Sequence, residues 1–185
     1  MKKKIQGLIQ QYAEIYQRFE DFQRKGLLPN GDQKTGVIGE YYAHCYYQSK
    51  PGVKSVEYAK SGEAFDLLLK LESGAEKRIQ VKCVSAHSKS RRIAPINIDD
   101  REEKPFDEIL FLDLDINFKP IGMYINSFEE LKKSVSANTT QTNRVIGATM
   151  KGRYGETGKI TKGSEIIDWS ENRVGELNDV LQNVD

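Results

Sequence analysis

The sequence is poor in the residues on which several classes of protein depend. It has only two cysteines, Cys45 and Cys83, and no C-x-x-C pair or His/Cys cluster. A disulfide-linked secreted fold and a structural zinc site are therefore not expected. No apolar run approaches the roughly 20 residues that a membrane-spanning helix needs. We expect no membrane partner, and we predict free thiols in a reducing, cytoplasmic compartment.

The sequence also has no marked excess of basic or acidic residues. The 185 residues include 28 basic and 27 acidic side chains, so the net charge of +1 gives no bulk sign of nucleic-acid binding. Contacts with nucleic acid would have to come from locally arranged basic residues. No apolar segment follows the lysines after Met1, so we expect no signal peptide. A glycine-rich nucleotide loop and a nucleophile elbow are absent too, which disfavours a small-molecule enzyme of those types.

The sequence does contain a helical start with an apolar stripe. Residues 1–30 include an amphipathic helix, and its apolar face is predicted to pack against the rest of the chain. The stripe consists of Ile5, Leu8, Ile9, Tyr12, Ile15, Tyr16, Phe19 and Phe22. A second helix is predicted to begin at Thr35, as its N-cap, and to end before Pro51 and Gly52.

Alternating segments then predict a sheet. The predicted strands are 54–59, 65–72, 77–85, 108–115 and 119–126. Gly74 favours a hairpin between the second and third of them, and residues 86–105 are predicted to form a loop. Ser127 and Glu130 form a capping box that predicts a further helix, and Ser170 is the expected cap of a C-terminal one. One α/β domain with a central mixed sheet flanked by helices is the expected class.

Polar residues on the strand 77–85 suggest a functional site. Because successive side chains of a strand point to opposite faces, Ile79, Val81 and Cys83 are predicted to face the core. Gln80 and Lys82 then share the other face. Two neighbouring polar groups on a sheet face are either solvated or held there for chemistry.

Two acidic residues are candidates for the same site. Asp66 lies across the predicted hairpin from Gln80, and Glu40 lies on the second helix, next to Gly36 and Gly39. Those glycines are poor helix formers, so we expect them to allow the helix a close approach to the sheet. Oxygen ligands of this kind suit Mg²⁺, with Mn²⁺ as an alternative, and a nearby lysine suits phosphodiester hydrolysis.

The order Glu40 … Asp66 … Gln80-Val81-Lys82 resembles the PD-(D/E)XK nuclease superfamily. "TGVIGEYYA" resembles its first helix, "GEAFDLLL" the strand with the motif aspartate, and "IQVKCVS" the motif strand. "FDEILFLDLDINFKPIGMYI" resembles the two following strands, so the likeness covers residues 35–126. The sequence departs from the pattern at Phe65, where the family has proline, and at Gln80, where it usually has an acid.

The resemblance implies a restriction-endonuclease-like fold in one nuclease-like domain over residues 1–185. Within it, 1–30 hold the N-terminal helix, 35–126 the core motif region, and 127–185 the C-terminal helices and a basic glycine-rich loop. The implied activity is Mg²⁺-dependent hydrolysis of DNA by an endonuclease of the type II restriction or defence kind, for which a homodimer is natural. The implied catalytic residues are Glu40, Asp66, Gln80 and Lys82, of which the first three are the metal ligands.

An alternative stays open at this point. Gln80 and the near-zero net charge favour a catalytically weak or inactive nuclease-fold module that binds DNA or a partner protein. In either case the candidate nucleic-acid contacts are Lys89, Arg91, Arg92, Lys151 and Arg153, and the competing interpretation is a solvated loop. His44, one turn after Glu40, and His87 are further candidates for proton transfer, which the sequence does not separate from ordinary polar residues.

Overall fold

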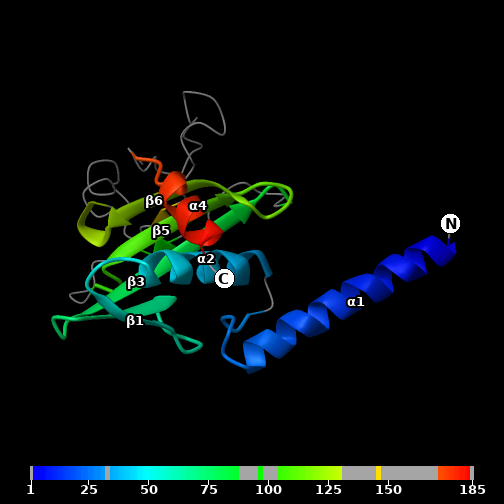
Figure 1. Ribbon diagram of the computed structural model, residues 1–185, viewed down its shortest axis with the longest axis horizontal. Coiled ribbons are helices and arrows are strands. Elements are labelled where there is room, and N and C mark those ends of the chain that lie inside the picture. The colour runs from blue at the N-terminus through cyan, green and yellow to red at the C-terminus, as the bar shows by residue number, and fades with distance from the viewer. Residues whose placement is uncertain are drawn as a thin grey trace.

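The structure, a computed structural model, describes residues 2–31, 34–87, 96–97, 104–130, 145–146 and 171–183 (Figure 1). The described helices include α1 (Lys2–Arg24), α2 (Lys34–Gln48) and α4 (Val174–Gln182). The described strands are β1 (Val53–Tyr58), β2 (Leu67–Leu71), β3 (Glu76–Ser85), β4 (Ile96–Asn97), β5 (Glu108–Leu114), β6 (Pro120–Ser127) and β7 (Val145–Ile146).

The larger sheet has the strand order β1-β2-β3-β5-β6. β3 and β5 run parallel, and the other neighbouring strands run antiparallel, so the sheet is mixed. Helices α2 and α4 cover one face of it, where Ala43, Tyr46 and Leu177 join the apolar side chains of the strands in one buried core. The predicted α/β class, a central mixed sheet flanked by helices, is confirmed.

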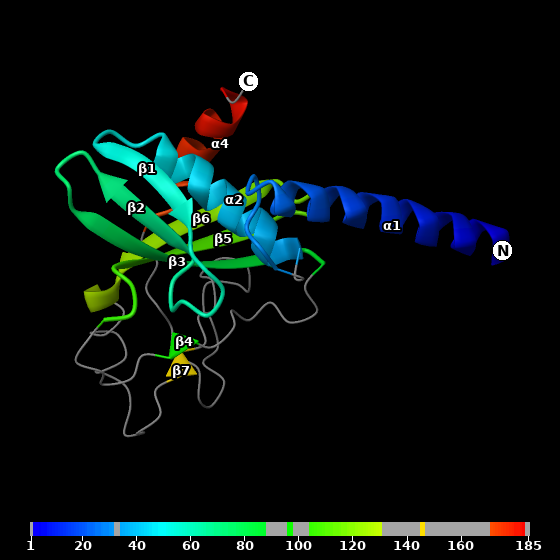
Figure 2. The same cartoon turned by 90° about the horizontal axis from the view of Figure 1, so that it is seen from below.

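The five strands of this sheet fall within two residues of their predicted bounds. The prediction of an unbroken loop over 86–105 is wrong, because β4 lies there and pairs with β7 in a separate two-stranded sheet (Figure 2). Strands of two residues are too short for a visible alternation of apolar and polar side chains.

Two predicted helix caps differ from the structure. Helix α2 already includes Lys34, so Thr35 lies inside it, and α4 has Arg173 rather than Ser170 as its N-cap. The side chain of Asn172 explains the second difference, because its Oδ1 accepts hydrogen bonds from Val174 N, at 3.1 Å, and from Met123 N, at 3.0 Å. The start of α4 is thereby fixed against β6.

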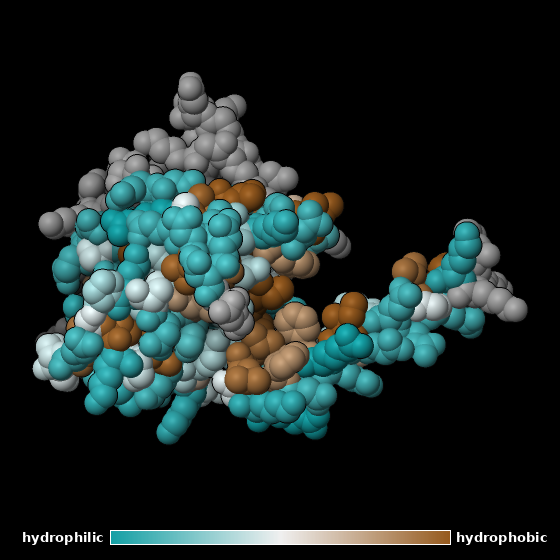
Figure 3. Space-filling model, in the orientation of Figure 1, coloured by the Kyte–Doolittle hydropathy of each residue, from teal (hydrophilic) through white to brown (hydrophobic). Residues whose placement is uncertain are grey.

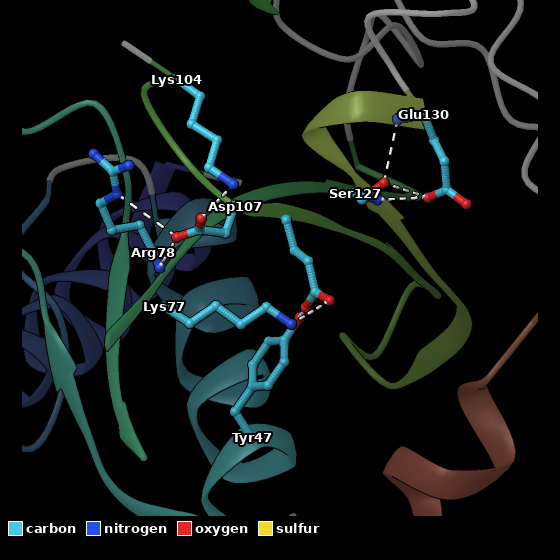
Figure 4. A network of polar contacts seen from close by, with 8 residues as sticks. Tyr47, Lys77, Arg78, Lys104, Asp107, Ser127 and Glu130 are labelled. Atoms are coloured by element: carbon cyan, nitrogen blue, oxygen red, sulfur yellow. Dashed lines mark hydrogen bonds and ion pairs between the residues drawn. The ribbon is translucent and has the colours of Figure 1, made fainter. Parts of the chain in front are cut away.

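The predicted hairpin turn and the predicted capping box are both present. Gly74 has φ of +86° in the hairpin between β2 and β3, a conformation that glycine adopts without strain. Ser127 and Glu130 form the expected capping box: Ser127 N donates to Glu130 Oε2 at 2.7 Å, and Glu130 N donates to Ser127 Oγ at 3.2 Å (Figure 4).

The sheet forks beside β3. The register of β2 against β3 ends at the pair Leu67 and Ile79, whereas β3 continues to Ser85 in register with β5 on its other side. Beyond Ile79, therefore, β3 has no strand beside it on the β2 side among the described residues. The backbone groups on that side need other partners or water.

Helix α1 projects from the body of the molecule (Figures 1 and 2). The prediction that its apolar stripe packs against the rest of the chain is wrong, because six of its side chains are between 47% and 66% exposed. These six are Ile5, Leu8, Ile9, Tyr12, Ile15 and Phe22. None of the described helices is both long and apolar enough to cross a membrane.

Candidate active site

Asp66 lies in the fork, immediately before β2. Its backbone still takes part in the sheet, since Asp66 N donates to Ile79 O at 2.8 Å and Ala59 N donates to Asp66 O at 2.9 Å. Its side chain crosses the fork instead of continuing the ladder: Oδ2 accepts a hydrogen bond from Val81 N at 2.6 Å. The carboxylate thus replaces the missing strand at the first unpaired position of β3.

Gln80 also reaches this carboxylate. Its amide nitrogen donates to Asp66 Oδ2, so the two side chains that the sequence placed across the hairpin are in direct contact. Ile79 and Val81 are buried in the core as predicted, Cys83 packs against the core but is only half-buried, and Gln80 and Lys82 on the other face are half-buried. Among the described residues, Lys82 forms no hydrogen bond or ion pair, so its ammonium is not neutralised by a single partner there.

Helix α2 brings Glu40 to the same place. Gly39 makes this possible, because a Cβ at that position would lie 2.4 Å from Cys83 Cβ on β3. The helix backbone therefore touches the strand, as predicted for the glycine pair. Gly36 has no such role: its nearest neighbour is Glu40 Oε1, at 3.9 Å from an added Cβ, which is an ordinary contact.

The surroundings of the two acidic side chains disfavour their ionised forms. Burial, and then the Asp66 carboxylate, raise the pKa of Glu40 from 4.5 to about 8, against the opposing effect of the Lys82 ammonium. Burial also raises the pKa of Asp66, and the hydrogen bond from Val81 N and the charge of Lys82 offset that effect only in part. Two carboxyl groups thus share a partly dry site with one cation, and this arrangement disfavours the fully ionised pair.

This donor set fits a hard divalent cation. Mg²⁺ commonly binds through one or two carboxylates, keeps several waters and completes its shell with substrate phosphate. Glu40 and Asp66 supply the carboxylates, and Oδ1 of Asp66 accepts no hydrogen bond from any described residue. No cluster of three or more His, Cys, Asp or Glu side chains suited to a metal occurs in the described part of the chain, so Gln80 would have to contribute a neutral oxygen.

The two histidines lie elsewhere. The imidazole of His44 is 3.1 Å from Val56 O and stacks on Tyr58 with 4.9 Å between ring centroids, and its burial lowers its pKa. His87 is exposed after the far end of β3, with its Nε2 2.8 Å from Ile116 O. Neither contacts Asp66, Gln80 or Lys82. The candidate backbone-binding residues Lys89, Arg91, Arg92, Lys151 and Arg153 lie outside the described residues.

Sequence reasoning missed the backbone contribution of Val81. Its N–H holds Asp66 in place, and no side-chain motif reveals that. The predicted arms of the hairpin, 65–72 and 77–85, are nearly equal in length, so the unpaired end of β3 could not be predicted from them.

Comparison with protein families and curated proteins identifies no relative. The chain matches no protein-family model, and no curated protein is significantly similar to it in sequence. The function of the protein therefore has to be inferred from the site itself.

Proposed function

We propose that this protein is a Mg²⁺-dependent endonuclease that hydrolyses phosphodiester bonds of DNA, with a restriction-endonuclease-like fold of the PD-(D/E)XK kind. The observation that carries the proposal is the fork beside β3. There Asp66 contacts both Gln80 and the backbone of Val81, and Glu40 is close enough for its charge to interact with those of Asp66 and Lys82. A pair of strained carboxyl groups beside a cation is typical of a functional site.

Each residue has a chemical role in this proposal. Glu40, Asp66 and the amide oxygen of Gln80 would hold the metal. Mg²⁺, when bound, would supply charge neutralisation for the phosphate and a water of lowered pKa. Lys82 would orient the attacking water by hydrogen bonding and stabilise the extra negative charge of the transition state. The hydrogen bond from Val81 N fixes the Asp66 carboxylate in one orientation, so that less ordering is required when substrate binds.

A second candidate function is a nuclease-fold module that binds DNA or a partner protein without cutting. The contact between Gln80 and Asp66 favours it, because an amide donor already satisfies part of the carboxylate. A neutral residue in the position of the usual acid also lowers the charge available to a metal.

A cleavage assay separates the two. The purified full chain is incubated with a panel of supercoiled and linear DNA, methylated and unmethylated, in Mg²⁺, in Mn²⁺ and in EDTA. The nuclease proposal predicts nicking or cutting that needs the metal and stops in EDTA. Binding to DNA in a mobility-shift assay without cleavage in either metal would replace it by the binding module.

A further inference from the structure

The apolar stripe of α1 has the spacing of a coiled-coil seam. Ile5, Leu8, Tyr12, Ile15, Phe19 and Phe22 follow one another at alternating steps of three and four residues, and all but the half-buried Phe19 are exposed. These are the a and d positions of consecutive heptads, a pattern typical of helices that pair along their length. Gln10 and Gln17 lie on the opposite side of the helix, at the f positions.

Within the part of the chain that the structure describes, helix α1 contacts the body through its C-terminal part, from Tyr16 onward. Gln23 is buried there and donates to Pro29 O at 2.6 Å and to Gly31 O at 2.9 Å, while Lys34 of α2 bonds to Glu20 at 2.9 Å. No described element packs along the rest of α1. Most of the stability of a helix in a protein comes from the packing of its apolar face and not from intrinsic helix propensity. The uncovered apolar face of α1 is therefore expected to pack against another molecule.

The apolar surface continues from α1 into the body. A cavity of about 700 Å³ opens at the root of the helix. Its lining includes Leu27, Tyr41, Cys45, Tyr58 and Val180, with Asp179 beside them. Figure 3 shows apolar side chains gathered where α1 meets the body and continuing along one edge of the helix.

We propose that α1 is the dimerisation element of this protein, and that it pairs antiparallel with α1 of a second copy of the chain. In the symmetric antiparallel register Ile5 of one copy packs against Phe22 of the other, Leu8 against Phe19, and Tyr12 against Ile15. The N-terminal turn of each helix then lies over the cavity at the root of the other. This inference does not depend on the nuclease proposal.

Charge selects the antiparallel orientation. Lys2, Lys3 and Lys4 open α1 without an acidic residue among them, so parallel helices would bring six lysines together at one end. In the antiparallel pair the two clusters are separated by the length of the helix, roughly 35 Å at 1.5 Å per residue. Each cluster instead lies beside Glu20, Asp21, Arg24 and Lys25 of the other copy, whose charges cancel, and near Asp179 at the edge of its cavity.

The available area is sufficient for a specific dimer. Five seam side chains that each expose on the order of 100 Å² give roughly 500 Å² of apolar surface on each helix, well within the range of the largest patches that monomers leave uncovered. Two copies together would bury roughly 1,000 Å² along the helices alone, which is the least area expected of a specific interface. The cavity contact adds to that area.

Sedimentation velocity over a range of protein concentrations tests the proposal. The double variant Leu8→Glu/Ile15→Glu puts charge into the seam and should raise the dimer dissociation constant at least about 100-fold. Gln10→Glu/Gln17→Glu adds the same charge at f positions and should change it less than about threefold. A wild-type chain that is monomeric at all concentrations would overturn the proposal, and its binding to lipid vesicles or DNA through α1 would reassign the stripe.

Cysteine cross-linking tests the orientation in a Cys45→Ser background. The double variant Ile5→Cys/Phe22→Cys should give a covalent dimer on mild oxidation, and Ile5→Cys alone should not. The two positions are about 25 Å apart within one helix, so they cannot join within a single chain. A covalent dimer from Ile5→Cys alone would show a parallel pair and overturn the proposed orientation.

Discussion

Asp66 and Asp107 hold β3 in the same way from its two sides. Each directly precedes a strand that flanks β3, Asp66 before β2 and Asp107 before β5. Each uses Oδ2 to accept a backbone hydrogen bond from β3, at 2.6 Å from Val81 N and at 2.7 Å from Arg78 N. Judged by backbone geometry alone, the two carboxylates have the same structural role.

Their charged neighbours differ. Asp107 is 2.9 Å from Lys104 Nζ and 3.7 Å from Arg78 Nε (Figure 4). Burial alone would raise its pKa, but the hydrogen bond from Arg78 N and the contact with Lys104 lower it overall. The pKa of Asp66 is raised, because burial dominates and because the effect of Lys82 is only partial. Glu40, next to Asp66, has a pKa of about 8.

Under the proposed function, the difference separates a structural carboxylate from a functional one. Asp107 is stabilised in its ionised form by partners within the fold, so it needs nothing from outside. Asp66 and Glu40 are held close together in a partly dry site, an arrangement that disfavours their ionisation until a cation from outside the chain joins them. The cluster around Asp107 is thus a matched control for the proposed active site.

The largest expected effect is on cleavage. Asp66→Asn keeps an acceptor for Val81 N but removes the charge of the proposed metal ligand, so cleavage should fall by at least about 100-fold, the upper range for loss of a supporting group around a metal. Asp107→Asn makes the same chemical change on the other side of β3 and should leave the rate within about threefold. Plasmid nicking rates at fixed Mg²⁺ measure both. Equal losses in the two variants would remove the functional distinction.

Substitutions of two lysines on β3 compare the proposed active site with a structural ion pair on the same strand. Lys82→Ala should lower the single-turnover rate by about 100-fold to 1,000-fold, because it removes a preorganised cation from the transition state. Lys82→Arg should not restore full activity, since guanidinium is larger and stays protonated. Lys77, which pairs with Glu108 at 2.5 Å, provides the control. Its change to alanine should leave the rate nearly unchanged. A fully active Lys82→Ala variant would exclude the proposed role.

The pH dependence of stability should have opposite signs at the two carboxyl clusters. Glu40 has a folded pKa of about 8 against an ordinary 4.5, so its contribution is fully present below pH 4.5 and is lost as pH rises to about 8. The slope is at most about 1.4 kcal/mol per pH unit. Asp107, with a lowered pKa, loses its contribution as pH falls.

Urea unfolding between pH 5 and 8.5 measures these slopes. Glu40→Gln should flatten the fall toward alkaline pH, and saturating Mg²⁺ should flatten it in the wild-type protein, because the cation favours the ionised carboxyl. Asp107→Asn should leave that alkaline fall intact. If Glu40→Gln preserves the wild-type slope, Glu40 is not the buried acid that the geometry indicates.

The smallest expected effect concerns Gln80. Gln80→Glu adds a carboxylate beside Asp66, so Mg²⁺ should bind about tenfold more tightly in calorimetry, which corresponds to about 1.4 kcal/mol. The same change should lower the melting temperature in EDTA, because a third acid then crowds the site. An unchanged Mg²⁺ affinity, with the melting temperature in EDTA also unchanged, would mean that residue 80 is ordinary strand surface.

Much of this arrangement could be predicted from the sequence. The period of two along β3 placed Ile79 and Val81 in the core, and the glycines near Glu40 indicated the close approach of α2. Both depend on local spacing, which the sequence records directly. Turn chemistry at Gly74 was equally local.

The remaining features depend on what lies beside an element. The fork at Val81 results from the register between strands, and the raised pKa of Glu40 results from three elements meeting. The apolar stripe of α1 shows most clearly what cannot be predicted from the sequence alone. Helical periodicity reveals an apolar face, but the pattern is the same whether the rest of the chain or another molecule covers it.

The contact of Gly39 with Cys83 has a consequence for how the protein tolerates change. Any other amino acid at position 39 places a carbon 2.4 Å from Cys83 Cβ, so the helix would have to move away from the strand and take Glu40 with it. In a library of all single substitutions selected for activity, position 39 should accept as few residues as position 66, although it touches no reacting group. Position 36, one turn earlier and uncrowded, should accept alanine.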